Sequence, residues 1–232
     1  MPDLFSHLSR FACAAIAIAL LVAISGCGDD DKSSASKEQD KSGNQADQAF
    51  LKAMVPHHES AVAMAQVAVE KGEHKEAQGL GRSIIETQSQ EIAQMSKLHS
   101  EIYGQEITPD EKAAGELGLS MEEAGMMHGG MDPGEKIKKG PIVDKVFIDE
   151  MVPHHQGAIL MARAVQSKGQ NPEVKKLAAT IIAEQTKEIE QMNSWRKDWY
   201  GAESPAGGVP TGSDTESKPP AEDSGEHGSG HE

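Results

Sequence analysis

Cysteine is nearly absent from this sequence: the chain has two, and neither lies in the region expected to fold. Cys13 falls in an N-terminal apolar run, and Cys27 follows that run after two small residues. Thiolates form disulfides, hold soft metals and act as cysteine nucleophiles. All three kinds of site are therefore excluded from the folded part of the chain.

Basic residues are scarce relative to acidic ones. The chain has 22 lysine and arginine residues against 37 aspartate and glutamate residues, which gives a formal net charge of -15. Loss of residues 1–26 removes one acid, Asp3, and one base, Arg10, so the net charge stays at -15. Because binding to a phosphate backbone needs a basic surface, the composition excludes nucleic acid as a partner.

No apolar run is long enough to span a membrane. The longest, residues 11–24, is shorter than the roughly 20 residues that a resident transmembrane helix needs. It is followed by Ile24-Ser25-Gly26-Cys27, which resembles the lipobox of a bacterial lipoprotein with Cys27 as the lipidated residue. An ordinary cleaved signal and an uncleaved anchor are the alternatives. The sequence thus predicts an exported lipoprotein of the cell envelope, periplasmic or on the outer face of the membrane, anchored through its N-terminal lipid.

Composition divides the chain into four parts. Residues 1–26 are the predicted signal peptide, and the polar residues 27–46 are expected to form a disordered tether. Residues 47–201 carry the apolar residues of a folded domain. Residues 202–232 are rich in Gly, Ser, Pro and acidic residues, which predicts a disordered acidic tail.

The predicted domain contains an internal repeat. Residues 50–104 align with residues 147–201 without a gap at a constant offset of 97, with 22 identities over 55 positions. The stretch Met-Val-Pro-His-His occurs once in each copy, and a methionine-rich connector, residues 105–142, joins the copies. A duplication of this length indicates one supersecondary unit used twice.

Hydrophobic periodicity predicts two helices in each copy, over about 47–71, 75–103, 143–168 and 172–200. Pro56 lies inside the first helix, where it is expected to kink the chain and free the carbonyl of Lys52. A hairpin cannot bury its apolar face alone. We therefore expect an all-α four-helix bundle made of two duplicated helical hairpins, with the histidines inside.

The histidine motifs point to a soft metal ion. Di-iron bundles carry Glu-x-x-His, which occurs nowhere in this sequence, and methionine instead stands three residues before the first histidine of each pair. Thioether and imidazole without thiolate favour a soft ion, and Cu(I) is the leading candidate in an oxidising, extracytoplasmic compartment. The candidate interior ligands are Met54, His57, His58, Met64, Glu91, Met95, Met151, His154, His155, Met161, Glu188 and Met192.

A second cluster of soft side chains lies in a glycine-rich stretch of the connector. As a flexible loop, this stretch is expected to wrap one Cu(I) with no help from the fold. Two other interpretations stay open: methionine is common core filler, and the paired histidines can be structural, bonded to glutamate and glutamine side chains across the bundle. The four candidate ligands of the loop are Met126, Met127, His128 and Met131.

The pattern Phe-x-x-x-Met-Val-Pro-His-His-x-x-Ala-x-x-Met-Ala, followed by Ile-Ile-x-x-Gln-x-x-Glu-Ile-x-x-Met, resembles the bacterial domain of unknown function 305 family. The resemblance covers both halves and implies a ferritin-like helical bundle, export and, for some members, copper binding and copper tolerance. It implies no settled reaction. It places the histidine pairs of the family at His57-His58 and His154-His155, and its methionines at Met54, Met64, Met95, Met151, Met161 and Met192.

These features together predict a membrane-anchored metal-binding protein that sequesters Cu(I), confers tolerance or hands the ion on, without catalysis. One alternative is a metal-free interaction or structural module of the envelope. Another, less favoured because Glu-x-x-His is missing, is a ferritin-like metal oxidase. The expected partners are a metal ion and the membrane; whether a homo-oligomer or a copper-transfer partner exists is not specified by the sequence.

Overall fold

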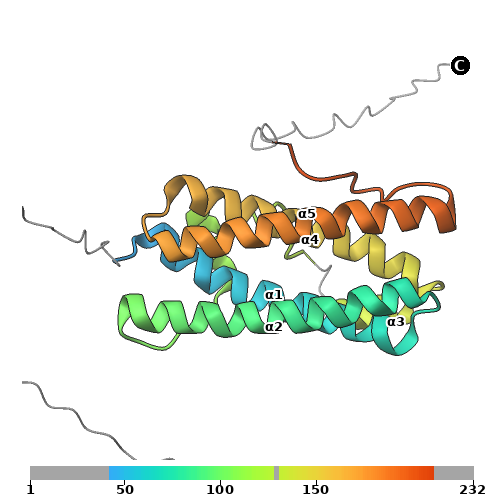
Figure 1. Cartoon of the computed structure of the whole chain (residues 1–232), viewed down its shortest axis with the longest axis horizontal. Helices are drawn as coiled ribbons and strands as arrows, with labels where there is room; N and C mark the ends of the chain where they lie inside the picture. The colour runs from blue at the N-terminus through green and yellow to red at the C-terminus, as the bar shows by residue number, and fades with distance from the viewer. Residues whose placement is uncertain (1–41, 128–130, 212–232) are drawn as a thin grey trace, which may run out of the picture. The chain divides into compact units, whose positions relative to one another are not determined.

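The computed structural model describes residues 42–127 and 131–211, which form helices and no strand (Figure 1). Four helices are long: α1 (Gln45–Lys71), α2 (Lys75–Tyr103), α4 (Val143–Lys168) and α5 (Pro172–Tyr200). Two short ones lie in the connector, the 3-10 helix η1 (Glu111–Leu117) and α3 (Pro133–Lys139). The predicted all-α class is confirmed, and α2, α4 and α5 have the bounds that periodicity predicts.

The long helices form two hairpins, α1 with α2 and α4 with α5, one from each repeat. The hairpins meet through α1 and α4, which pack against each other, whereas α2 and α5 barely touch (Figure 1). Two apolar clusters fill the bundle, and each takes residues from both halves. The prediction of a four-helix bundle made of two duplicated hairpins is confirmed.

Helix α1 begins earlier than periodicity predicts. The Asn44 side chain accepts a hydrogen bond from the N–H of Asp47 at 3.0 Å, and the Asp47 carboxylate accepts one from the N–H of Asn44 at 2.9 Å. This capping box fixes the start of the helix at Gln45. The predicted tether, residues 27–46, is therefore wrong at its C-terminal end, because capping chemistry rather than an apolar stripe sets the boundary. Residues 27–41 lie outside the described residues.

Pro56 lies within α1, and the helix continues through it. Proline has no N–H, so the carbonyl of Lys52, one turn earlier, has no donor from its own helix. The backbone N–H of Asp110, next to η1, donates to that carbonyl at 2.9 Å. The predicted freeing of the Lys52 carbonyl is confirmed, and the connector supplies the hydrogen bond that the proline removes.

Two buried aspartates join the halves. Asp47, near the start of α1, accepts hydrogen bonds at 2.9 and 3.1 Å from two backbone N–H groups in the turn between α4 and α5. Asp144, near the start of α4, accepts hydrogen bonds at 3.0 and 2.8 Å from two backbone N–H groups in the turn between α1 and α2. Each half is thus fastened to the hairpin turn of the other, with α1 and α4 antiparallel. The backbone donors are Gln170, Asn171, Glu73 and His74.

Both hairpin turns carry glycine where the aspartate approaches. A Cβ on Gly72 would lie 2.6 Å from Oδ1 of Asp144, and a Cβ on Gly169 would meet Oδ1 of Asp47 more closely still. No side chain fits between each turn and its aspartate. This close approach explains why glycine follows the first helix in both copies of the repeat.

The predicted disordered tail, residues 202–232, is wrong for residues 202–211. These residues lie against α4 and α5, where Gln156 donates to the carbonyls of Ala206 and Gly208 at 2.9 and 2.6 Å, and Arg163 donates to the carbonyl of Pro210 at 2.7 Å. Composition predicted disorder because the segment has few apolar residues. Polar side chains of the helices bind its backbone instead. Residues 212–232 lie outside the described residues.

Within the part of the chain that the structure describes, no helix combines the length and the apolar character needed to cross a membrane. The predicted signal peptide, residues 1–26, and the predicted lipidation site, Cys27, lie outside that part. Both therefore stay predictions from the sequence.

Candidate metal centre

Four histidines lie in the core where α1 meets α4. His57 and His58 belong to α1, His154 and His155 belong to α4, and each pair follows the proline within its helix. All four are buried. The rings of His57 and His154 face each other across the two halves, with centroids 3.7 Å apart. The fold thus brings the two predicted histidine pairs together.

The second histidine of each pair bonds a glutamate of its own hairpin. Nε2 of His58 lies 2.9 Å from Oε2 of Glu91, and Nε2 of His155 lies 2.6 Å from Oε2 of Glu188. An ionised carboxylate only accepts hydrogen bonds, so Nε2 of each ring carries the proton. In the neutral imidazole, Nδ1 then keeps a free lone pair.

That lone pair has no hydrogen-bond partner among the described residues, in His58 and His155 alike. Both residues are fully buried, and a buried acceptor left unsatisfied costs about 1–3 kcal/mol. A histidine that binds a metal through one nitrogen usually donates its other N–H to a carboxylate or carbonyl. The arrangement of these two rings therefore fits metal ligands.

The glutamines that were expected to share this network do not do so. Oε1 of Gln88 and both amide atoms of Gln185 have no hydrogen-bond partner among the described residues, although both side chains are buried. The structural interpretation of the histidines required these amides to bond imidazoles. That interpretation holds for Glu91 and Glu188, but not for the glutamines.

Six completely buried methionines fall into two groups that the repeat relates. Each apolar cluster of the bundle holds two of these six methionines from one half and one from the other. Sulfur atoms from both hairpins are thus available in each cluster. The first group is Met54, Met95 and Met161, and its counterpart is Met151, Met192 and Met64.

The connector methionines differ in their surroundings. Met126 is buried in the same apolar cluster as Met54, whereas Met127 and Met131 are 65% and 44% exposed. His128 lies outside the described residues. The structure thus separates Met126 from the two exposed methionines of the predicted loop, a difference that spacing alone does not reveal. Whether these side chains bind an ion stays a prediction.

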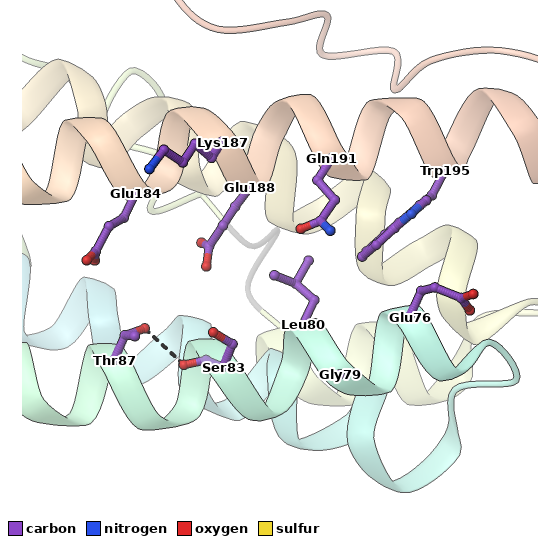
Figure 2. Close-up of a pocket in the computed structure, with 10 residues that line it drawn as sticks. All are labelled: Glu76, Gly79, Leu80, Ser83, Thr87, Glu184, Lys187, Glu188, Gln191 and Trp195. Carbon is purple, nitrogen blue, oxygen red and sulfur yellow. Dashed lines mark hydrogen bonds between the residues drawn. The ribbon is translucent and has the colours of Figure 1, made fainter.

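A groove of about 560 Å³ lies along the seam between α2 and α5 (Figure 2). Figure 2 shows the carboxylates of Glu184 and Glu188 pointing from α5 toward α2, with Ser83 and Thr87 opposite. Burial raises the pKa of Glu184 above its usual range, and the negative charges of Glu91 and Glu188 raise it further, with Lys187 opposing them. The groove therefore reaches the glutamate that holds His155.

Sequence reasoning missed Glu184 and the two clamping aspartates. Glu184 has Thr87 as its counterpart in the first copy, so the repeat hides it, although it stands four residues before Glu188 on the same helix. Asp47 and Asp144 lie three positions before the aligned repeats. Extending the alignment at the same offset would have paired them.

The donor set decides which ions suit this interior. Among the described residues, no group of three or more His, Cys, Asp or Glu side chains is arranged to hold a metal ion. The core of each half instead contains buried imidazole nitrogens and thioether sulfurs. Such donors suit soft ions, whereas carboxylate and carbonyl oxygens suit hard ones.

Comparisons with known proteins agree with this picture. The family model described as Domain of unknown function (DUF305) matches residues 27–99 and 144–231. CopM in the Cu(I)-bound form is 33% identical, with 67% of this chain and 98% of that chain covered and a TM-score of 0.55. CopM in the Ag-bound form, obtained by soaking, is 33% identical over 67% of this chain and 97% of that chain, with a TM-score of 0.54.

Two further similarities are more limited. A DUF305 protein from Streptomyces coelicolor is 22% identical, with 68% of this chain and 96% of that chain covered and a TM-score of 0.56, which shows the fold alone. The uncharacterized protein L153 of Acanthamoeba polyphaga mimivirus is 42% identical over 53 residues, 23% of this chain. That match spans 35% of the length of the viral protein.

Proposed function

This chain belongs to the DUF305 family, and from that premise we propose that it is an exported protein that binds Cu(I) in its bundle core without catalysing a reaction. The observation that carries the proposal is the buried Nδ1 of His58 and of His155, each on a ring whose Nε2 bonds a carboxylate. CopM, whose structures match 66–67% of this chain, has been solved with Cu(I), Cu(II) and Ag. That similarity supports copper as the class of ligand.

Each residue type has a separate role in this proposal. His58 and His155 bind through Nδ1, while Glu91 and Glu188 hold the two rings in the required tautomer. His57 and His154, between them, and the six buried methionines supply the remaining nitrogen and sulfur donors. Neutral donors suit a monovalent ion in a core that excludes water, because no unpaired anionic ligand has to be buried with it.

The test is an anaerobic Cu(I) titration of the full-length protein against a competing chelator, with Zn(II) and Fe(II) run in parallel. We expect tight Cu(I) uptake and weak uptake of the two harder ions. Because the core site exists only in the folded state, bound Cu(I) should stabilise that state by about 2.7 kcal/mol when free Cu(I) is 100 times Kd. The midpoint of thermal unfolding should therefore also rise. Absence of both effects would remove copper binding as the function.

We also propose that the exposed thioethers Met127 and Met131 form a second, outer site, with His128 as the third ligand from the same stretch. Replacing Met127, His128 and Met131 together by Ala should lower the number of bound Cu(I) ions by one and leave the core site intact. The matched control is Met126→Leu, a volume-conserving change at a buried position. Equal stoichiometry in the triple variant and the wild type, measured by the same titration, would show that the connector holds no ion.

We propose in addition that residues 1–26 are a signal peptide and that Cys27 carries the lipid. The support for export and anchoring is in the sequence, where a short apolar run precedes Ser25-Gly26-Cys27. In that arrangement, the lipid would hold the copper-binding domain at the membrane surface.

A metal-free structural module is the second candidate, and one observation favours it. The His58–Glu91 and His155–Glu188 bonds are themselves buried polar interactions that can specify the packing of the bundle. This candidate predicts that chelator treatment leaves the thermal unfolding midpoint unchanged and that added Cu(I) does not raise it. The titration therefore separates the two functions.

A further inference from the structure

The groove between α2 and α5 exists because one of its walls is made of small side chains. Gly79, Ser83 and Thr87 stand four residues apart, so they line one face of α2. A Cβ on Gly79 would meet no atom within 4 Å. The helices α2 and α5 barely touch and belong to different hairpins, so the space beside these small residues stays open, although Leu80 and Trp195 also line the groove.

The opposite wall, on α5, contains the glutamate of one histidine–glutamate pair. Glu188 lines the groove with 16% of its side chain exposed, and its carboxylate lies 2.6 Å from Nε2 of His155. On the α2 side, Glu91 bonds His58 through Oε2, and its side chain is 10% exposed. Glu188 therefore connects the groove to a buried imidazole ring, and Glu91 makes the equivalent bond one turn beyond Thr87 on α2.

A buried carboxylate oxygen close to Glu184 lacks a partner. Oε1 of Glu91 has no hydrogen-bond partner among the described residues, and the whole residue is 8% exposed. Glu91 lies close enough to Glu184 for its charge to raise the pKa of Glu184, as the charge of Glu188 does. The Glu184 carboxylate is thus repelled by one carboxylate from each helix, and Lys187 opposes that effect.

We propose that this groove is the port through which monovalent soft cations reach the buried histidines, with Glu184 drawing the ion in and Glu188, in the groove wall, leading it to the ring of His155, where Nδ1 binds it. An entering cation relieves the repulsion among the carboxylates, so the groove attracts it before any soft ligand is reached. Glu184 is a positioning residue here, because the histidines and not Glu184 retain the ion. The inference rests on the proposed function, since it presumes that the core binds the ion.

A competing route runs through the connector. A second cavity of about 320 Å³ is lined by Met127 and His154, together with Glu122, Gly125, Glu150 and Pro153. This cavity brings the exposed thioether of Met127 near His154 of α4. The α2–α5 groove is favoured because Glu188 in its wall is bonded directly to a buried imidazole ring.

The experiment measures the rate at which the full-length protein takes up Ag(I), a redox-inert soft cation, by stopped-flow competition with a chromogenic chelator. Glu184→Gln should slow uptake roughly tenfold at low ionic strength and should flatten the salt dependence of the rate. Ser83→Phe, which fills the groove, should slow it further. Both variants should bind the same number of ions at equilibrium as the wild type.

The controls make the same chemical changes elsewhere on the same helices. Glu190→Gln on α5 and Ser89→Phe on α2 alter exposed residues that do not line the groove, and both should leave the rate unchanged. Normal rates in Glu184→Gln and Ser83→Phe, with a slow rate in Met127→Ala, would overturn the groove as the port and leave copper binding in place. Failure of the wild type to bind Ag(I) or Cu(I) at equilibrium would instead overturn the proposed function.

Discussion

Replacing both histidine–glutamate pairs by apolar residues is expected to leave a folded bundle that no longer binds Cu(I) tightly. The variant carries His58→Leu with Glu91→Met and His155→Leu with Glu188→Met. Removing both partners of a buried hydrogen bond leaves no unsatisfied polar atom behind, so the free energy of unfolding should change little. Cu(I) affinity, measured by anaerobic chelator competition, should fall on the order of 1,000-fold, about 4.1 kcal/mol.

The single changes give the contrast that makes this result interpretable. His58→Leu alone leaves the Glu91 carboxylate buried without its partner, and breaking a buried pair in this way costs about 3–5 kcal/mol. Glu91→Gln keeps the shape of the side chain but permits the other tautomer of His58, so it should weaken Cu(I) binding about 10- to 100-fold with little loss of stability. If the fourfold variant keeps the affinity of the wild type, the histidines are structural and the methionines hold any bound ion.

The helices of this fold could be read from the sequence because each has a clear apolar stripe and a defined end. Gly104 and Gly201, with φ of 70° and 85°, end α2 and α5 where the apolar periodicity ends. At the start of α5, the Asn171 side chain accepts hydrogen bonds from the N–H groups of Glu173 and Val174. The start of α1 was missed because Gln45 and Ala46 extend the helix by capping chemistry alone. Residues 202–211 were missed because their binding depends on side chains of helices far away in sequence.

The candidate site could be predicted only in part, for a related reason. The repeat identified both histidine pairs and both glutamates, since identical residues recur at one offset. It could not show that Met161 joins the group of Met54 and Met95, because that grouping depends on how the hairpins cross. It also hid Glu184, which interrupts the symmetry of the repeat and faces carboxylates from both halves.

Loss of either clamping aspartate is expected to have the largest effect on stability of any single change outside the histidine core. Asp47→Ala leaves N–H groups of Asn44, Gln170 and Asn171 without their acceptor. Hydrogen bonds to a charged group contribute about 1.5–3 kcal/mol each, and the N–H of Asn171 is buried with its partner. We therefore expect the free energy of unfolding to fall by about 3–5 kcal/mol in chemical denaturation.

The same change at the other clamp should give a loss of similar size. Asp144→Ala removes the acceptor of two backbone N–H groups and of Nδ1 of His74, which lies 2.6 Å from the carboxylate. His74 also stacks on Trp199 at 3.7 Å between centroids, so part of its position survives the loss. Asp198→Ala, at an exposed position of α5, is the matched control and should change stability by less than about 0.5 kcal/mol.

The double variant tests whether the two clamps act independently. Asp47 lies near the start of α1 and Asp144 clamps the turn at its other end, and a helix of 27 residues is about 40 Å long. Sites so far apart that share no partner should have additive effects within about 0.5 kcal/mol. A loss well below the sum would mean that releasing one turn already separates the hairpins, so that α1 and α4 depend on both clamps to stay paired. Additivity would instead assign most of the pairing to the apolar packing between α1 and α4, with each clamp holding only its own end.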